Sequence, residues 1–66
     1  MMQQAVLTAW TAADRAVVTE GACVAEVAVE GRRHRITAPA SGRLFREAAL
    51  EDVLEPGDAI GRIEPV

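Results

Sequence analysis

Two stretches of this chain repeat each other at a spacing of 36 residues, and both read apolar-x-x-Gly-x-x-apolar-x-x-apolar. The first copy is Val18, Gly21, Val24 and Val27, and the second is Leu54, Gly57, Ile60 and Ile63. A glycine that ends a turn and releases the chain into a short apolar strand explains both copies, because glycine adopts positive φ without steric cost. The repeat therefore predicts two similar halves that face one core.

A β-hairpin is predicted between the two copies. Within Glu26 to Thr37, two runs that contain β-branched residues flank the segment Glu30-Gly31-Arg32-Arg33. The proline and glycine of residues 38–42 mark a turn, since proline cannot occupy the middle of a sheet. Pro56-Gly57 predicts a last turn before a closing strand near Ala59 to Ile63.

Residue propensities favour helix in two other segments. Ala5 to Val18 and Arg46 to Leu54 are rich in Ala, Leu, Glu and Arg, which are good helix formers. Taken alone, these segments predict an α+β protein with helices beside a hairpin. Strands are expected there instead, because of the resemblance described below.

The chain length of 66 residues predicts one domain, residues 1–66, that buries only about 60% of the surface of its unfolded chain. Trp10 and Phe45 are the only aromatic residues, so we expect a thin core with Trp10 as a packing anchor. Cys23 is a single cysteine in an apolar run, which predicts core packing and excludes a disulfide within one chain. No metal site is expected.

Other features of the composition narrow the class of protein. No apolar run approaches the roughly 20 residues that cross a bilayer, and the start of the chain has no basic residue, so a cytoplasmic protein is expected. The net charge of −3 argues against a nucleic-acid partner. No Ser/His/Asp or paired-acid arrangement has credible spacing, so we do not expect an enzyme. Asp52 and Asp58 flank the last turn, where short acidic side chains commonly accept hydrogen bonds from backbone N–H groups.

Three motifs together resemble the biotinyl/lipoyl carrier family. They are Gly21-x-x-Val24-Ala25-Glu26-Val27, Thr37-Ala38-Pro39-Ala40-Ser41-Gly42, and Asp52-x-Leu54-x-x-Gly57-x-x-Ile60-x-x-Ile63. Trp10 also stands where that family has a tryptophan in its first strand. The resemblance implies an all-β fold, a flattened barrel-sandwich hybrid of two antiparallel sheets with quasi-twofold symmetry.

The chain departs from the family at the residue that defines a carrier. The family's modified lysine falls at Gly31, and all seven basic residues of this chain are arginine. A guanidinium stays protonated and is a poor nucleophile, so we expect no biotin or lipoate cofactor. The family's two Gly-Asp pairs are also replaced, by Arg15-Ala16 and by Glu51-Asp52.

The best candidate for a surviving binding site is the run Arg32, Arg33, His34 and Arg35 at or beside the hairpin tip. Guanidiniums offer forked donors to phosphate or carboxylate groups. The alternative is a solvated, charged tip that protects a sheet edge from unwanted pairing. His34 is expected to be an ordinary surface residue.

Three functions are compatible with this sequence. The first is a non-carrier docking or regulatory module for partners that receive carrier domains, such as a carboxylase, a 2-oxo acid dehydrogenase or an acyltransferase complex. The second is an anion-binding module for phosphate or nucleic acid that uses the arginine-rich tip. The third is a structural piece of an assembly that pairs through an exposed sheet edge.

Overall fold

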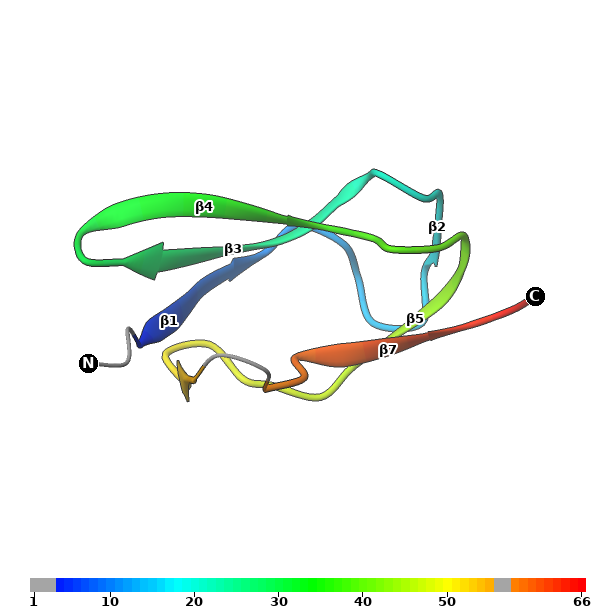
Figure 1. Cartoon of the computed structure of the whole chain (residues 1–66). Helices are drawn as coiled ribbons and strands as arrows, with labels where there is room; N and C mark the ends of the chain where they lie inside the picture. The colour runs from blue at the N-terminus through cyan, green and yellow to red at the C-terminus, as the bar shows by residue number, and fades with distance from the viewer. Residues whose placement is uncertain (1–3, 56–57) are drawn as a thin grey trace.

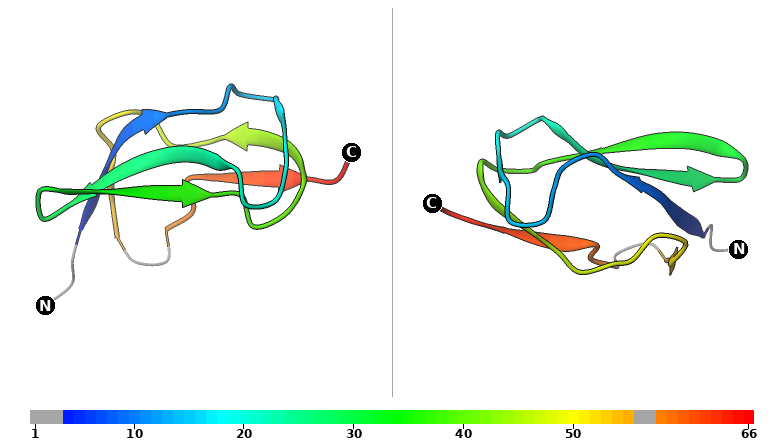
Figure 2. Two further views of the ribbon diagram at one scale, coloured as in Figure 1. Left: turned by 90° about the horizontal axis from the view of Figure 1, so that it is seen from above. Right: turned by 180° about the vertical axis from the view of Figure 1, so that it is seen from behind.

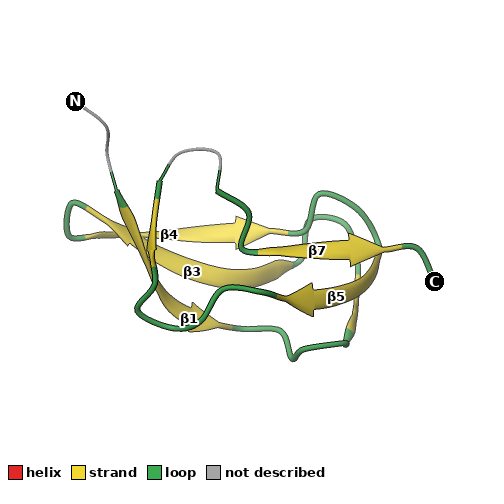
Figure 3. Cartoon of the chain, turned by 90° about the horizontal axis from the view of Figure 1, so that it is seen from below, coloured by secondary structure: helices red, strands yellow, loops and turns green. Residues whose placement is uncertain are grey.

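The computed structural model describes residues 4–55 and 58–66, and within them it contains seven strands and no helix (Figures 1 and 3). The strands are β1 (Ala5–Trp10), β2 (Val17–Val18), β3 (Cys23–Val29), β4 (Arg32–Thr37), β5 (Gly42–Arg46), β6 (Val53–Leu54) and β7 (Gly61–Glu64). The all-β prediction is confirmed. The turn predicted at Pro56-Gly57 lies outside the described residues.

The strands form two antiparallel sheets. Sheet A has the order β4-β3-β1-β6, and sheet B has the order β2-β5-β7. Among the described strands no pairing joins the two sheets, so they form an open sandwich rather than a closed barrel. The β3–β4 hairpin projects from one end of the sandwich, and the molecule is accordingly elongated, 38 Å long and 17 Å in its other two dimensions (Figures 1 and 2).

The strand pairing repeats between the two halves of the chain. Strand β1 pairs with β3 and β6, and strand β5 pairs with β7 and β2. The register repeats as well, because Leu7 faces Val27 in sheet A while Leu44 faces Ile63 in sheet B. A β-bulge at Thr8 adds one residue to β1. Equivalent residues of β1 and β5 are therefore 37 positions apart before the bulge, as Leu7 and Leu44 are, and 36 positions apart after it.

Hydrogen bonds of the connecting loops follow the same repeat. Arg15 N–H donates to Leu44 C=O at 2.6 Å, and Glu51 N–H donates to Leu7 C=O at 2.8 Å. Arg15 and Glu51 both have left-handed backbone, with φ of 69° and 71°. The sequence resemblance aligns these two residues with the family's Gly-Asp turns, and the chain adopts there a conformation that glycine would adopt more easily.

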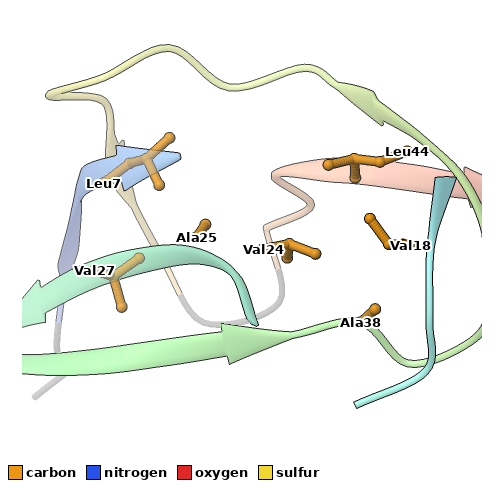
Figure 4. Close-up of a cluster of buried hydrophobic side chains, with 7 residues drawn as sticks. All are labelled: Leu7, Val18, Val24, Ala25, Val27, Ala38 and Leu44. Atoms are coloured by element: carbon orange, nitrogen blue, oxygen red, sulfur yellow. The ribbon is translucent and has the colours of Figure 1, made fainter. Parts of the chain in front are cut away.

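The core lies between the sheets and consists of small aliphatic side chains (Figure 4). Its buried members are Leu7, Val18, Val24, Ala25, Val27, Ala38 and Leu44. The three apolar positions of the first repeat copy are all buried, whereas those of the second copy are only half-buried. For Ile60 and Ile63 the difference follows from topology, because β4 extends sheet A beyond β3 while no described strand lies beyond β7.

Three predicted details differ from the structure. The closing strand begins at Gly61 rather than near Ala59, because Ile60 C=O accepts hydrogen bonds from two N–H groups of the loop after β5. The segment from Glu47 to Asp52 forms a loop, not a helix or a long strand. Cys23 is half-buried rather than fully buried, since it lies at the bulged start of β3.

Candidate functional site

The tip of the β3–β4 hairpin is a two-residue turn. Val29 pairs with Arg32, so Glu30 and Gly31 form the loop, with φ of 50° and 78°. Positive φ at both central residues is the mark of a type I′ turn, which matches the twist of the flanking strands and favours glycine. A Cβ atom placed on Gly31 would meet nothing within 4 Å. Gly31, which the sequence resemblance aligns with the carrier lysine, is therefore sterically free and carries no side chain.

The four candidate residues after the tip alternate between the two faces of sheet A. All of Arg32, Arg33, His34 and Arg35 are exposed. Successive side chains of a strand point to opposite faces, and directly paired residues share a face. Because His34 pairs with the buried Val27, Arg32 and His34 lie on the face of sheet A that carries the core. They lie on the projecting end of that face.

The other two arginines share the outer face of sheet A. Arg35 pairs directly with Glu26, and Arg33 forms a long ion pair with the same carboxylate, Nη1 to Oε1 at 3.8 Å. The Arg33 side chain is 80% exposed, so this ion pair contributes little to stability. The structure thus brings together Arg33 and Arg35, and it does not bring Arg32 to the same face.

Trp10 connects the two sheets, as the sequence predicts. Its indole Nε1–H donates to Ala48 C=O at 3.1 Å, and its half-buried ring packs against the core. The Arg46 guanidinium lies 4.9 Å from the ring centroid. Trp10 and Arg46 are equivalent positions of the repeat, since they pair with Ala25 and Gly61. Residues at equivalent positions therefore contact each other where the two halves meet.

Sequence reasoning missed a charged cluster around Arg62 on β7. Its guanidinium donates to Glu47 Oε2 and to Glu64 Oε2, each at 2.9 Å, and it lies 4.6 Å from the centroid of the Phe45 ring. The hydrogen bonds to Glu64 and Glu47, of which the one to Glu64 has the larger effect, raise the pKa of Arg62 above its ordinary value. The Arg-x-Glu spacing in the strand was the one local signal for this cluster.

An apolar cavity of about 120 Å³ lies between β7 and the end of β4. Its apolar lining includes Trp10, Val24, Ile36, Leu44, Ile60 and Ile63, with Arg62 beside them. The sequence could not reveal this cavity, because its walls come from both sheets.

The two aspartates near the last turn have the predicted partners. Asp52 Oδ2 accepts a hydrogen bond from Ala49 N–H, and Asp58 Oδ2 accepts one from Glu55 N–H, both at 2.9 Å. In the described part of the chain, no group of three or more His, Cys, Asp or Glu residues could hold a metal ion. Residues 4–55 and 58–66 also contain no helix that could span a membrane.

Comparison of the chain with protein-family models, with curated proteins and with solved structures gives no match.

Proposed function

We propose that this chain is a biotinyl/lipoyl-like domain without a carrier lysine, and that it acts as a docking or regulatory module. Its partners would be enzymes that receive carrier domains, of the carboxylase, 2-oxo acid dehydrogenase or acyltransferase type. The observation that carries the proposal is the hairpin tip, where Gly31 occupies a free-standing type I′ turn at the position of the modified lysine.

Two features of the fold support this assignment. The repeated pairing of β1 with β3 and β6, and of β5 with β7 and β2, fits a barrel-sandwich hybrid with quasi-twofold symmetry. The left-handed residues Arg15 and Glu51 fit the two Gly-Asp turns of the same architecture. Both features depend on backbone geometry, so they support the assignment even though the side chains at those turns differ.

The mode of action follows from the shape of the hairpin. The β3–β4 hairpin projects from the sandwich with its arginines exposed (Figure 1). An enzyme that accepts a carrier hairpin would therefore contact this hairpin before the rest of the domain. A tip without an amine can occupy the same surface but cannot deliver an acyl or carboxyl group. The chain would therefore compete with true carriers, and Arg33 and Arg35 would contribute charge to that contact.

Competition with a genuine carrier tests the proposal directly. A purified carboxylase, a 2-oxo acid dehydrogenase and an acyltransferase are each assayed on their carrier domains with increasing amounts of this chain. We expect competitive inhibition of at least one enzyme, reduced by the Arg33→Glu, Arg35→Glu double variant. Arg43→Glu on sheet B, which is also exposed, is the control and should inhibit like the native chain. Absence of inhibition in all three assays contradicts the docking role.

Restoring the amine provides a second test of the scaffold. Gly31→Lys has room for its side chain, although positive φ costs a non-glycine residue about 1–2 kcal/mol. With ATP and cofactor, we expect a biotin or lipoate ligase to modify the variant, as detected by mass spectrometry, and to leave the Gly31→Arg control unmodified. A folded Gly31→Lys variant that stays unmodified beside an efficiently modified carrier would argue against recognition of this scaffold.

Anion binding is the second candidate function, and the shared outer face of Arg33 and Arg35 is the observation that favours it. Two guanidiniums on one face could hold a phosphate group, with binding that weakens steeply as salt is added. Titration of phosphate, nucleotides and RNA at low salt should then shift the amide resonances of Gly31 to Ile36. Unchanged resonances exclude this function.

A further inference from the structure

The free edge of β7 is the most prominent unpaired feature of sheet B. In sheet A, β3 has β1 on one side and β4 on the other, whereas β7 has β5 on one side and no described strand on the other. Repetition of the pairing makes β3 and β7 equivalent, so the edge of β7 corresponds to the place that β4 fills in sheet A. The apolar cavity lies beside this edge.

Backbone geometry shows which groups the edge offers. Leu44 N–H and C=O bond to Ala16 and Arg15, away from β7, so the directly opposite Leu44–Ile63 pair has no mutual hydrogen bonds. By the alternation of an antiparallel ladder, the N–H and C=O groups of Ile63 point to the free edge. The same alternation directs Gly61 N–H and C=O to that edge. These groups can bond to an added strand.

The sequence of β7 is complementary to itself when two copies run antiparallel. With a twofold axis at Ile63, that residue lies opposite its own copy, and Arg62 lies opposite Glu64 of the second chain. Each of the two Ile63 residues then donates N–H to the other's C=O. Gly61 lies opposite Pro65, which has no N–H, so the paired segment is short and the association weak.

Side-chain placement agrees with this register. Paired residues must share a face, and the axis at Ile63 pairs apolar with apolar on the cavity side and basic with acidic on the other side. The Arg62 and Glu64 side chains are 53% and 52% exposed, so both can reach a neighbouring chain. A register shifted by one residue would place Arg62 opposite Ile63 on different faces, which the pleat does not allow.

We propose that two copies of this chain associate through their β7 edges around a twofold axis at Ile63, and that the three-stranded sheets B join into a six-stranded sheet. The second copy supplies the strand that β4 supplies in sheet A. The interface is closed, because each chain presents the same segment to the other. Its short length predicts a dissociation constant between about 1 µM and 1 mM.

Reciprocal charge variants test the proposal by sedimentation and by NMR. Arg62→Glu places two acidic pairs across the interface, and Glu64→Arg places two basic pairs there. Each variant alone should dimerise at least about tenfold more weakly than the native chain. An equimolar mixture should associate again, because every cross-chain pair then joins unlike charges. Arg33→Glu, on the far sheet edge, is the control and should leave the dimer unchanged.

Two outcomes overturn the proposal. The first is a native chain that stays monomeric at about 1 mM, where even a dimer with the largest dissociation constant expected would be about half formed. The second is a dimer that responds to neither charge variant, or single variants that do not associate when mixed. Dispersed NMR spectra of each variant show that it is folded, and in the native dimer the Ile63 and Gly61 amides should exchange more slowly as concentration rises.

Discussion

The half of the molecule built on β1 and the half built on β5 have the same pairing but different surroundings. In the first half, β4 lies beyond β3, and Val24 and Val27 are only 4% and 5% exposed. In the second half, no described strand lies beyond β7, and the equivalent Ile60 and Ile63 are half-buried beside a cavity. Equal patterns in the sequence thus specify equal pairing, while the outer strand decides the burial.

The same comparison separates two exposed regions by what they can do. The hairpin of the first half ends in a two-residue turn with open space around Gly31. The edge of the second half offers unpaired backbone groups next to an apolar hollow. The tip is suited to recognition by another protein's pocket, and the edge is suited to strand addition. Substitutions at equivalent positions can therefore show whether the two halves contribute equally to the stability of the domain.

The largest effect is expected from the two central leucines, Leu7 and Leu44, which are equivalent and 0% and 3% exposed. Leu7→Ala and Leu44→Ala should each cost about 2–5 kcal/mol, because each leaves a cavity between the sheets. Chemical denaturation measures both changes, and Val17→Ala, at a 61% exposed position, should cost far less. If one leucine change costs less than about 1 kcal/mol, the halves do not share the core equally.

A smaller, stabilising effect is expected at the two left-handed turns. Arg15→Gly and Glu51→Gly should each raise the free energy of unfolding by about 0.5–1 kcal/mol, since glycine removes the strain but adds entropy to the unfolded chain. Both residues use backbone N–H groups for their loop bonds, and glycine keeps these.

Gly21→Ala is the matched control for these turns. Gly21 has φ of 87°, and a Cβ there meets nothing within 4 Å. Alanine should therefore destabilise the chain by about 0.5–1 kcal/mol, because its strain exceeds the entropy that it removes from the unfolded chain. Denaturation curves of the three variants give the comparison. Destabilisation by both glycine variants would show that the strain at Arg15 and Glu51 is compensated by their side chains.

Much of the fold could be predicted from local signals. The apolar-Gly spacing identified the repeat, and Glu30-Gly31 between two β-branched runs identified the hairpin. Helix propensity in Ala5–Trp10 was misleading, because that segment is paired on both sides, with β3 and with β6, and places Leu7 in the core. Tertiary pairing overrode the local preference there.

Features that join distant residues could not be predicted. Arg62 meets Glu47 and the Phe45 ring only after β5 and β7 have paired, and the cavity forms only where two sheet edges face each other. For the four residues predicted at the hairpin, exposure could be predicted from the sequence. Their division between two faces could not, because it depends on the register against β3. One residue of slip would exchange the two pairs.

The smallest effect on stability is expected at Arg33, on β4 in the first half of the chain. Arg33→Ala removes one ion pair at 3.8 Å from a side chain that is 80% exposed, so stability should change by no more than about 0.5 kcal/mol. Arg62→Ala removes two hydrogen bonds at 2.9 Å and the contact with the Phe45 ring, so its cost should be the greater of the two. Thermal denaturation of dilute samples, which keeps any dimer dissociated, measures both. A larger cost at Arg33 would mean that the hairpin stabilises the sandwich through its charged face, and that face would then be part of the fold rather than a free surface for a partner.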